Sequence, residues 1–232
     1  MTLLGESSGK RVEPATGSLI HPSARLHPTA IIEDGVSIGA GTSIWDHVHV
    51  RPNARIGENC ILGEKTYIAY DVRIGNCVKI NSFVYVCTGV TIEDYVMISA
   101  GTVFTNDRLP RAFKVDGFSV KESDPTEDTL QTVVQRGVSI GAHCTIGPGI
   151  RLGEYCLVGM GSVLTRSVEP FHLVYGNPAK FRGLVCICGN ILTRENLGGC
   201  SGRDIPCSRC HRNYVLDELG LRLHSPGGVE GQ

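Results

Sequence analysis

An apolar residue recurs at every sixth position of this chain over two long runs. From residue 20 to 104, and again from 134 to 164, each sixth residue is Ile, Leu, Val or Phe. A helix cannot use this pattern, because six steps of about 100° place successive apolar residues on different faces. In a strand, side chains alternate with a period of two, so residues six apart point the same way. The period therefore predicts short strands that share one apolar face.

A second inward row and a row of bends accompany the large apolar residues. Two positions before most of them stands a small or β-branched residue, such as Ala30, Thr42 or Val72. Hexads this short cannot bury their faces alone, so they must stack into a solenoid. Three positions after many of the large residues stand residue types that tolerate a left-handed backbone at a corner, namely Gly35, Gly41, Asn53, Asn59, Asp71, Gly89 and Gly101.

The repeat is interrupted once and then ends. Residues 105–133 are charged and contain two prolines, which predicts a loop excursion from the solenoid. Past residue 183 the composition changes, and five cysteines crowd into residues 186–210. The expected organisation is a flexible tail, a solenoid domain, a small cysteine module and a second flexible tail, over residues 1–18, 19–183, 184–216 and 217–232.

Composition excludes several classes of protein. The 232 residues carry a formal net charge of −1 with 41% hydrophobic residues, so no basic footprint for nucleic acid is present. No apolar stretch approaches the length of a membrane span. The first 18 residues lack the apolar core and cleavage site of a signal peptide. We expect a cytoplasmic protein that binds neither nucleic acid nor membrane.

Specific motifs within the repeats resemble a known family. The stretch HPTAIIEDGVSIGAGTSIWDHVHVRPNARIGENCILG, with VKI, GVTIED, VFTND and Pro110-Arg111 further along, is similar to the hexapeptide-repeat acyltransferases. The likeness covers about residues 20–183. Within the family, the chain most resembles N-acetyltransferases that act on the 3-amino group of a UDP-2-acetamido-3-amino-dideoxyhexuronate. It implies a left-handed parallel β-helix with three hexads per turn, a homotrimer, and an excursion that shapes a site against the neighbouring subunit.

The resemblance implies transfer of an acetyl group from acetyl-CoA to an amino group of a nucleotide-linked sugar. Such a reaction needs an uncharged amine placed against the thioester carbonyl and a route for the proton. Asn81 and Ser82 sit at outward positions and can orient the amine while the departing thiolate takes the proton. His49 matches a family histidine, and two interpretations stay open for it: a general base or sugar ligand, and a solvent-facing or interface residue.

The other histidines and the remaining ligand contacts are assigned as follows. His47 falls at a corner and is expected to point outward, whereas turns and packing account for His21, His27, His143 and His172. The family resemblance places acetyl-CoA along the late turns, at Ala142, Gly159 and Gly161. Two interpretations stay open for Lys180 and Arg182 just past the last turn: cations that meet its phosphates, and an ordinary basic surface. It also places Asn106 and Arg111 on the nucleotide-sugar side.

Two stretches depart from the family pattern. Glu64-Lys65 stands where the relatives usually carry Gln-Asn, and Asn81-Ser82-Phe83 stands where they carry Gln-Asn-Asn. The second stretch contacts the substrate in the family. These departures leave open which amino sugar is accepted and whether activity is retained.

The cysteine module predicts a metal site. Cys186 and Cys188, followed by Cys207 and Cys210, form two pairs with the spacing of zinc knuckles. Cys200 and His211 are alternative ligands. With all ligands supplied by the protein, a structural zinc is expected in a zinc-ribbon-like module that docks a protein partner or caps the trimer.

Two other functions compete with the acetyltransferase. A non-catalytic trimeric scaffold, using the zinc ribbon as an adaptor, is supported by the departures at residues 64–65 and 81–83. A γ-class carbonic anhydrase needs three histidines that converge between subunits, and the spacing of His47, His49 and His143 offers no obvious set. The carbonic anhydrase is therefore the weakest of the three.

Overall fold

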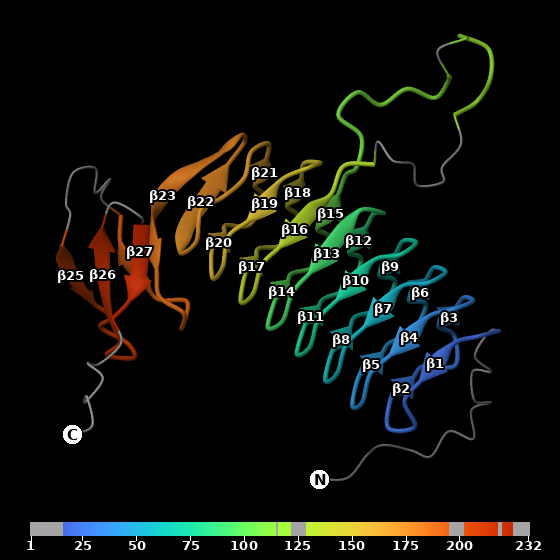
Figure 1. Ribbon diagram of the computed structural model, residues 1–232, viewed down its shortest axis with the longest axis horizontal. Helices are drawn as coiled ribbons and strands as arrows, with labels where there is room; N and C mark the ends of the chain where they lie inside the picture. Colours follow the sequence, from blue (N-terminus) through green and yellow to red (C-terminus); the bar gives the residue numbers. More distant parts are fainter. Residues whose placement is uncertain (1–15, 115, 122–128, 195–201, 218–219, 225–232) are drawn as a thin grey trace, which may run out of the picture.

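The chain winds into a long parallel β-solenoid followed by a small antiparallel sheet (Figure 1). The computed structural model describes residues 16–114, 116–121, 129–194, 202–217 and 220–224. These residues form strands, turns and loops, with no helix among them, so the described ranges hold no helical membrane span. The all-β parallel solenoid predicted from the six-residue period is confirmed.

Three sheets form the walls of the solenoid, and we call them faces 1, 2 and 3. Face 1 contains β1 (Leu19–Ile20), β4 (Ser37–Ile38), β7 (Arg55–Ile56), β10 (Arg73–Ile74), β13 (Val90–Ile92), β16 (Thr132–Val134) and β19 (Arg151–Leu152). Face 2 contains β2 (Arg25–Leu26), β5 (Ser43–Ile44), β8 (Ile61–Leu62), β11 (Lys79–Ile80), β14 (Met97–Ile98), β17 (Ser139–Ile140) and β20 (Leu157–Val158), and continues into β22 (His172–Gly176), β23 (Ala179–Val185) and β24 (Ile191–Thr193). Face 3 contains β3 (Ile31–Ile32), β6 (His49–Val50), β9 (Tyr67–Ile68), β12 (Tyr85–Val86), β15 (Val103–Phe104), β18 (Thr145–Ile146) and β21 (Val163–Leu164).

The strand register confirms three hexads per turn. Ile20 pairs with Ile38, and Ile38 with Ile56, so each turn lies parallel on the turn before it. The large row and the small row both point inward, and nearly all of their members are buried in one continuous core. Threonines in the small row bond to corner carbonyls of the next turn, as when Thr42 Oγ1 donates to Gly57 O at 2.7 Å. The left-handed winding implied by the family remains a prediction.

The corners from Gly35 to Gly101 and from Gly137 to Gly161 each have a residue with a left-handed backbone, as the bend pattern predicts, whereas the corners at Ser23 and Thr29 on the first turn do not. Gly35, Asn53 and Asp71 have φ values of 68°, 61° and 56°. The same conformation also occurs at large residues in the same register, such as Lys65 and Phe83. On these turns the corner conformation is therefore also adopted by residue types other than Gly, Asn and Asp.

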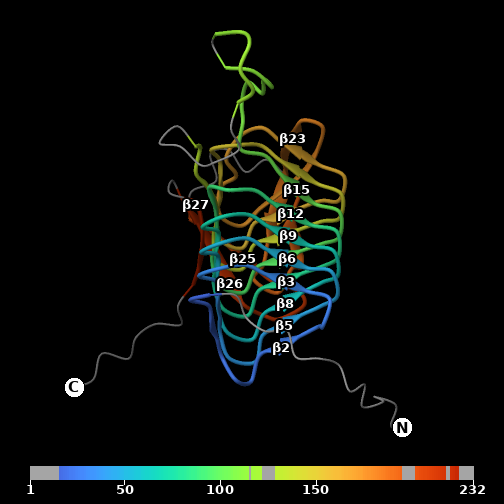
Figure 2. The ribbon, with the colours of Figure 1, turned by 90° about the vertical axis from the view of Figure 1, so that its right-hand side faces the viewer.

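The strand order locates the excursion and the strands at the end of the solenoid. The excursion leaves after β15 and returns at β16, and its described part projects away from the turns (Figures 1 and 2). The expected boundary between residues 183 and 184 falls inside β23, because this strand pairs with β22 on face 2. The small sheet of β25 (Arg203–Pro206), β26 (Asn213–Asp217) and β27 (Gly220–Leu223) extends into the expected tail, because Leu221 packs inward and is buried.

Candidate functional site

A groove lies on the early turns of the corner where the chain passes from face 2 to face 3. We call this edge corner 2/3; it consists of residues 27–30, 45–48, 63–66, 81–84, 99–102, 141–144 and 159–162. On the early turns the groove has a volume of about 240 Å³ and is lined by Trp45, Asp46, Ile61, Gly63, Glu64, Ile80, Asn81 and Ser82. The predicted amine-orienting residues Asn81 and Ser82 therefore both face this groove. The groove is partly polar, and it also carries one exposed aromatic side chain, because Trp45 is 53% exposed.

Gly63 allows the turns to approach closely in this groove. A Cβ atom added at Gly63 would lie 2.7 Å from Asn81 C and 2.7 Å from Ser82 N. These contacts are with backbone, which cannot move aside as a flexible side chain can. Any larger residue at this position would push the turn carrying Asn81 and Ser82 away.

The two stretches that depart from the family pattern meet at the same place. Phe83 N donates to Glu64 O at 3.0 Å, and Lys65 Nζ lies 5.0 Å from the centroid of the Phe83 ring. The ammonium and the ring face are arranged as in a cation–π contact. The departures at 64–65 and 81–83 are therefore neighbours on adjacent turns and form one altered surface.

A charged cluster lies on the outer surface of face 3, and none of its residues lines the groove. His49 Nε2 contacts Glu33 Oε1, and Arg51 Nε forms an ion pair with the same oxygen at 2.8 Å. Arg51 Nε makes no hydrogen bond within the described residues, so this second contact is electrostatic. Arg51 Nη1 donates to Tyr67 Oη at 2.9 Å. Glu33 thus orients the His49 ring, and Arg51 anchors both the carboxylate and Tyr67.

Aromatic rings continue this surface along face 3. The His49 ring meets the Tyr67 ring edge-to-face at 5.3 Å between centroids, and Tyr67 stacks on Tyr85 at 5.1 Å. Our sequence analysis missed Glu33, Arg51, Tyr67 and Tyr85. The signal was present, since His49, Tyr67 and Tyr85 stand at one outward position eighteen residues apart, as the strand register shows.

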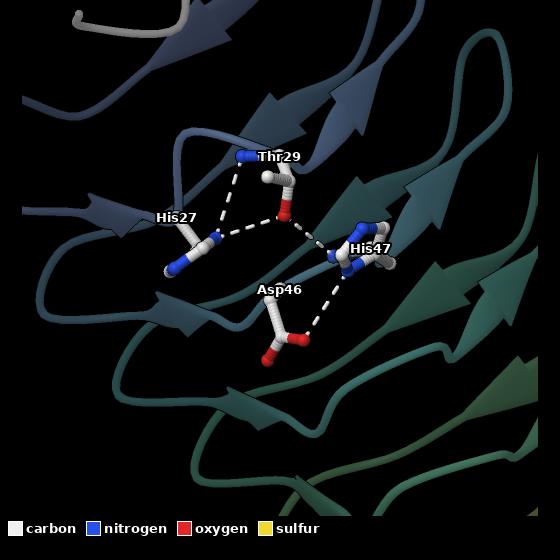
Figure 3. Close-up of polar contacts among 4 residues, drawn as sticks. All are labelled: His27, Thr29, Asp46 and His47. Carbon is white, nitrogen blue, oxygen red and sulfur yellow. Dashed lines mark hydrogen bonds and ion pairs between the residues drawn. The ribbon is translucent and has the colours of Figure 1, made fainter. Parts of the chain in front are cut away.

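His27 and His47 belong to a local network on the first two turns of corner 2/3 (Figure 3). His27 Nδ1 bonds with Thr29 Oγ1 at 2.9 Å, and Thr29 Oγ1 accepts from His47 N at 3.1 Å. His47 Nδ1 lies 3.2 Å from Asp46 Oδ2, and this hydrogen bond lowers the pKa of Asp46. Both histidines are exposed and serve corner geometry here, as expected, while Asp46 lines the groove.

The predicted acetyl-CoA residues of the late turns lie on the same corner. Gly161 N donates to Ala142 O at 2.8 Å, so these two residues stack on adjacent turns. An added Cβ at Gly161 meets no atom within 4 Å, whereas one at Gly159 would lie 2.7 Å from Tyr175 Cβ. Gly161 therefore borders open space, and Gly159 makes room for Tyr175.

The remaining predicted contacts lie further out. Lys180 and Arg182 are exposed on β23, where the Arg182 guanidinium lies 5.1 Å from the centroid of the Tyr175 ring. Asn106 is half-buried at the base of the excursion, and Arg111 is exposed further along it, donating to Pro110 O at 2.9 Å. Neither Asn106 nor Arg111 is among the residues that line the groove.

Four cysteine thiols converge at the end of the solenoid. Cys186 and Cys188 lie between β23 and β24, and Cys207 and Cys210 lie between β25 and β26. The four sulfur atoms all lie within 4.8 Å of one another. His211 is exposed and is not part of this group, and Cys200 lies outside the described residues.

Comparisons with known proteins match the repeats and a set of sugar acyltransferases. A family model described as bacterial transferase hexapeptide (six repeats) matches residues 37–69, 71–106 and 131–166. A dTDP-3-amino-3,6-dideoxy-alpha-D-galactopyranose 3-N-acetyltransferase from Aneurinibacillus thermoaerophilus is 44% identical over 58 residues, which is 25% of this chain and 30% of that protein. The chain thus matches less than a third of the length of that curated relative.

Two solved structures are among those similar to this chain. AntD, an N-acyltransferase from Bacillus cereus in complex with dTDP and 3-hydroxybutyryl-CoA, is 20% identical with a TM-score of 0.43, covering 72% of this chain and 79% of that one. PerB from Caulobacter crescentus, in complex with CoA and GDP-perosamine, is 19% identical with a TM-score of 0.37, covering 72% of this chain and 58% of that one. The segments matched by the bacterial transferase hexapeptide model all lie in the solenoid, whose register is three hexads per turn, and this part of the chain is similar to that family.

Proposed function

We propose that this protein transfers an acyl group from an acyl-CoA to an amino group of a nucleotide-linked amino sugar. The observation that carries the proposal is the groove at corner 2/3, which Asn81 and Ser82 line, while Gly161 borders open space further along the same corner. The relative from Aneurinibacillus thermoaerophilus further supports the proposal, because it is an acetyltransferase of a dTDP-linked 3-amino sugar. We take acetyl-CoA as the acyl donor.

The proposed step is a direct attack of the sugar amine on the thioester. The amine nitrogen bonds to the carbonyl carbon, and the carbon–sulfur bond then breaks. The thiolate of CoA leaves and takes the proton lost by nitrogen, so an amide and free CoA thiol are the products. Placement of the two reactants supplies most of the rate enhancement in such a reaction.

Particular residues have separate tasks in this proposal. Asn81 and Ser82 accept hydrogen bonds from the amine and aim its lone pair at the carbonyl. His49, held by Glu33, contacts the sugar or receives the proton from nitrogen. Ala142, Gly159 and Gly161 line the path of the acyl-CoA, with Lys180 and Arg182 toward its phosphates, and Asn106 and Arg111 reach the nucleotide.

A homotrimer is part of the same proposal. The outward row of face 3 carries the apolar residues Ile31, Tyr85 and Val103, which are 54%, 43% and 40% exposed. Packing of face 3 against a second copy would cover this row and would close the groove with the neighbour's excursion. Light scattering of the purified protein tests this directly, with a mass three times that of one chain as the expected result. The proposal places the enzyme in the cytoplasm, where acyl-CoA is available.

Binding of acetyl-CoA is the first test of the proposed function. We expect calorimetry to show micromolar affinity with one site per chain, and Gly161→Asn to weaken that affinity. Aminosugar nucleotides can then be screened by the release of free CoA thiol, with Asn81→Ala and Ser82→Ala expected to lower kcat. An absence of acyl-CoA binding by the trimeric, folded protein would refute the acyltransferase.

A non-catalytic scaffold is the second candidate function. The observation in its favour is the altered surface at residues 64–65 and 81–83, where Lys65 lies over Phe83 beside the groove. The scaffold predicts no acyl-CoA binding at all. The same calorimetric titration therefore separates the two candidates.

A further inference from the structure

The four converging thiols have the dimensions of a metal site. Cys186 Sγ lies 3.4 Å from Cys210 Sγ, and Cys188 Sγ lies 3.7 Å from Cys207 Sγ. A tetrahedral zinc ion with bonds of about 2.3 Å to sulfur requires sulfur atoms about 3.8 Å apart. Sulfur atoms joined in a disulfide lie only about 2.05 Å apart, and all four cysteines are free. The thiols thus fit a metal ion with small adjustments and do not fit disulfides.

We infer that Cys186, Cys188, Cys207 and Cys210 bind one zinc ion in a closed tetrathiolate site that anchors the small sheet to the last turn of the solenoid. All four positions around the ion are filled by protein, so the site has no open position for a substrate. Sulfur-only tetrahedral sites suit zinc or iron, and zinc is the ion expected where two short turns each present a pair of cysteines. The site is structural and independent of acyl transfer.

Hydrogen-bond donors surround the sulfur atoms. The Tyr214 hydroxyl lies 3.0 Å from Cys186 Sγ, and Cys188 N donates to Cys186 Sγ at 3.4 Å. Asn190 Nδ2 donates to Cys207 Sγ at 3.7 Å. Four thiolates around a divalent cation leave two excess negative charges, and such donors offset them. The surroundings of the thiols therefore favour a charged, metal-bound state.

Tyr214 connects the site to the solenoid. Its ring meets the ring of Phe171 edge-to-face at 5.8 Å, and Phe171 stacks on Tyr155 at 5.5 Å. Phe171 lies at the corner after the last complete turn, and Val185 N donates to Phe171 O at 2.8 Å. Tyr214 thus contacts the proposed ligand Cys186 with its hydroxyl and Phe171 of the solenoid with its ring. Metal binding would therefore order the surface that covers the end of the solenoid core.

Metal analysis of the full chain is the first test. The protein is purified without chelators and under reducing conditions, and zinc and iron are measured together. We expect one zinc per chain, and substitution with Co²⁺ is expected to give the strong visible absorption and thiolate charge-transfer bands of tetrahedral cobalt. Iron in place of zinc, no metal with no uptake of added Zn²⁺, or a cobalt spectrum without thiolate bands would each overturn the inference.

Substitutions test the ligands and the role of Tyr214. Cys188→Ser is expected to abolish the one-to-one zinc content, while Cys77→Ser, an exposed cysteine of the solenoid, is expected to retain it. Tyr214→Phe keeps the ring against Phe171 but removes the contact with Cys186 Sγ, so we expect transfer of zinc to a chelator at about 10- to 100-fold lower chelator concentration. Retention of full zinc by Cys188→Ser, or unchanged zinc affinity in Tyr214→Phe, would contradict the assignment.

Discussion

Glu33 and His49 stand sixteen residues apart in the sequence, yet their side chains meet on the outer surface of face 3, where Glu33 Oε1 contacts His49 Nε2. Arg51 holds the same carboxylate oxygen at 2.8 Å. The contact exists because the outward positions that flank the core residues of successive turns lie side by side. It converts an isolated histidine into one with a defined ring orientation on face 3, while Asn81 and Ser82 line the groove of corner 2/3.

Glu33→Gln tests whether this orientation matters for acyl transfer. We expect kcat to fall about tenfold, because a misplaced catalytic group loses much of its advantage, while the KM for acyl-CoA stays unchanged. His49→Gln is expected to lower kcat by about 10²-fold or more if the ring moves a proton. Steady-state kinetics with detection of free thiol measure both effects. Glu58→Gln, at an exposed glutamate on another corner, serves as the control, and wild-type kinetics in both variants would make His49 an interface residue.

Gly161→Asn tests the path of the acyl-CoA along corner 2/3. Gly161 has φ 68°, and an added Cβ would meet no atom within 4 Å. Asn tolerates a left-handed backbone, so the fold is expected to accept it. We expect the KM for acyl-CoA to rise about tenfold with Tm nearly unchanged, because the new side chain fills space needed by the ligand.

Gly17→Asn is the matched control for this path. Gly17 has φ 73°, is equally open, and lies before the first strand of the solenoid at its other end. Its KM for acyl-CoA is expected to equal that of the wild type. Equal KM values in Gly17→Asn and Gly161→Asn would place the ligand elsewhere on the surface.

The sequence was sufficient for the core but not for contacts between turns. The inward rows and the corner at Gly35 could be predicted because they depend only on the alternation of a strand and a period of six. Glu33, Arg51 and Tyr67 were missed because their contacts depend on which outward side chains of successive turns reach one another, and the period of the inward rows does not specify this. β27 was missed for a similar reason, since its inward Leu221 packs against a small core assembled from distant segments.

The predicted site residues also divide into those whose position the repeat determines and those whose position it does not. Asn81 shares a groove with Gly63 and Trp45, because residues three hexads apart stack on one corner. Asn106 and Arg111 lie on the excursion, whose course no repeat determines. The four cysteines converge from two separate turns, and their pairwise spacing alone was enough to predict the group.

Ile146→Ala and Thr145→Ala test which rows stabilise the solenoid. Ile146 is fully buried in β18, and its neighbour Thr145 is exposed on the same strand. We expect Ile146→Ala to lower the free energy of unfolding by about 2–5 kcal/mol through lost burial and a cavity. Thr145→Ala is expected to change it by about 0.5 kcal/mol or less. Urea unfolding followed by circular dichroism measures both, and equal losses would contradict the inward row.

His172 gives the end of the solenoid a sensitivity to acid. Burial lowers the pKa of His172 in the folded protein, and its ring packs edge-to-face on Phe181 at 4.6 Å between centroids. The unfolded chain then binds more protons than the folded one as the pH falls through about 6.5, the ordinary pKa of histidine. The contribution of His172 to stability is therefore complete above this pH and is lost progressively toward the lowered folded pKa.

His172→Gln is expected to reduce this acid sensitivity. The fall in Tm between about pH 7.5 and pH 5.5 should be smaller in His172→Gln than in the wild type, because one group that gains a proton on unfolding has been removed. His224→Gln, at an exposed histidine beyond β27, should leave the wild-type fall in Tm unchanged. Thermal unfolding at both pH values measures the difference. An equal fall in Tm for the wild type and His172→Gln would show that protonation of the His172 ring does not destabilise the fold. Other groups would then cause the loss of stability in acid.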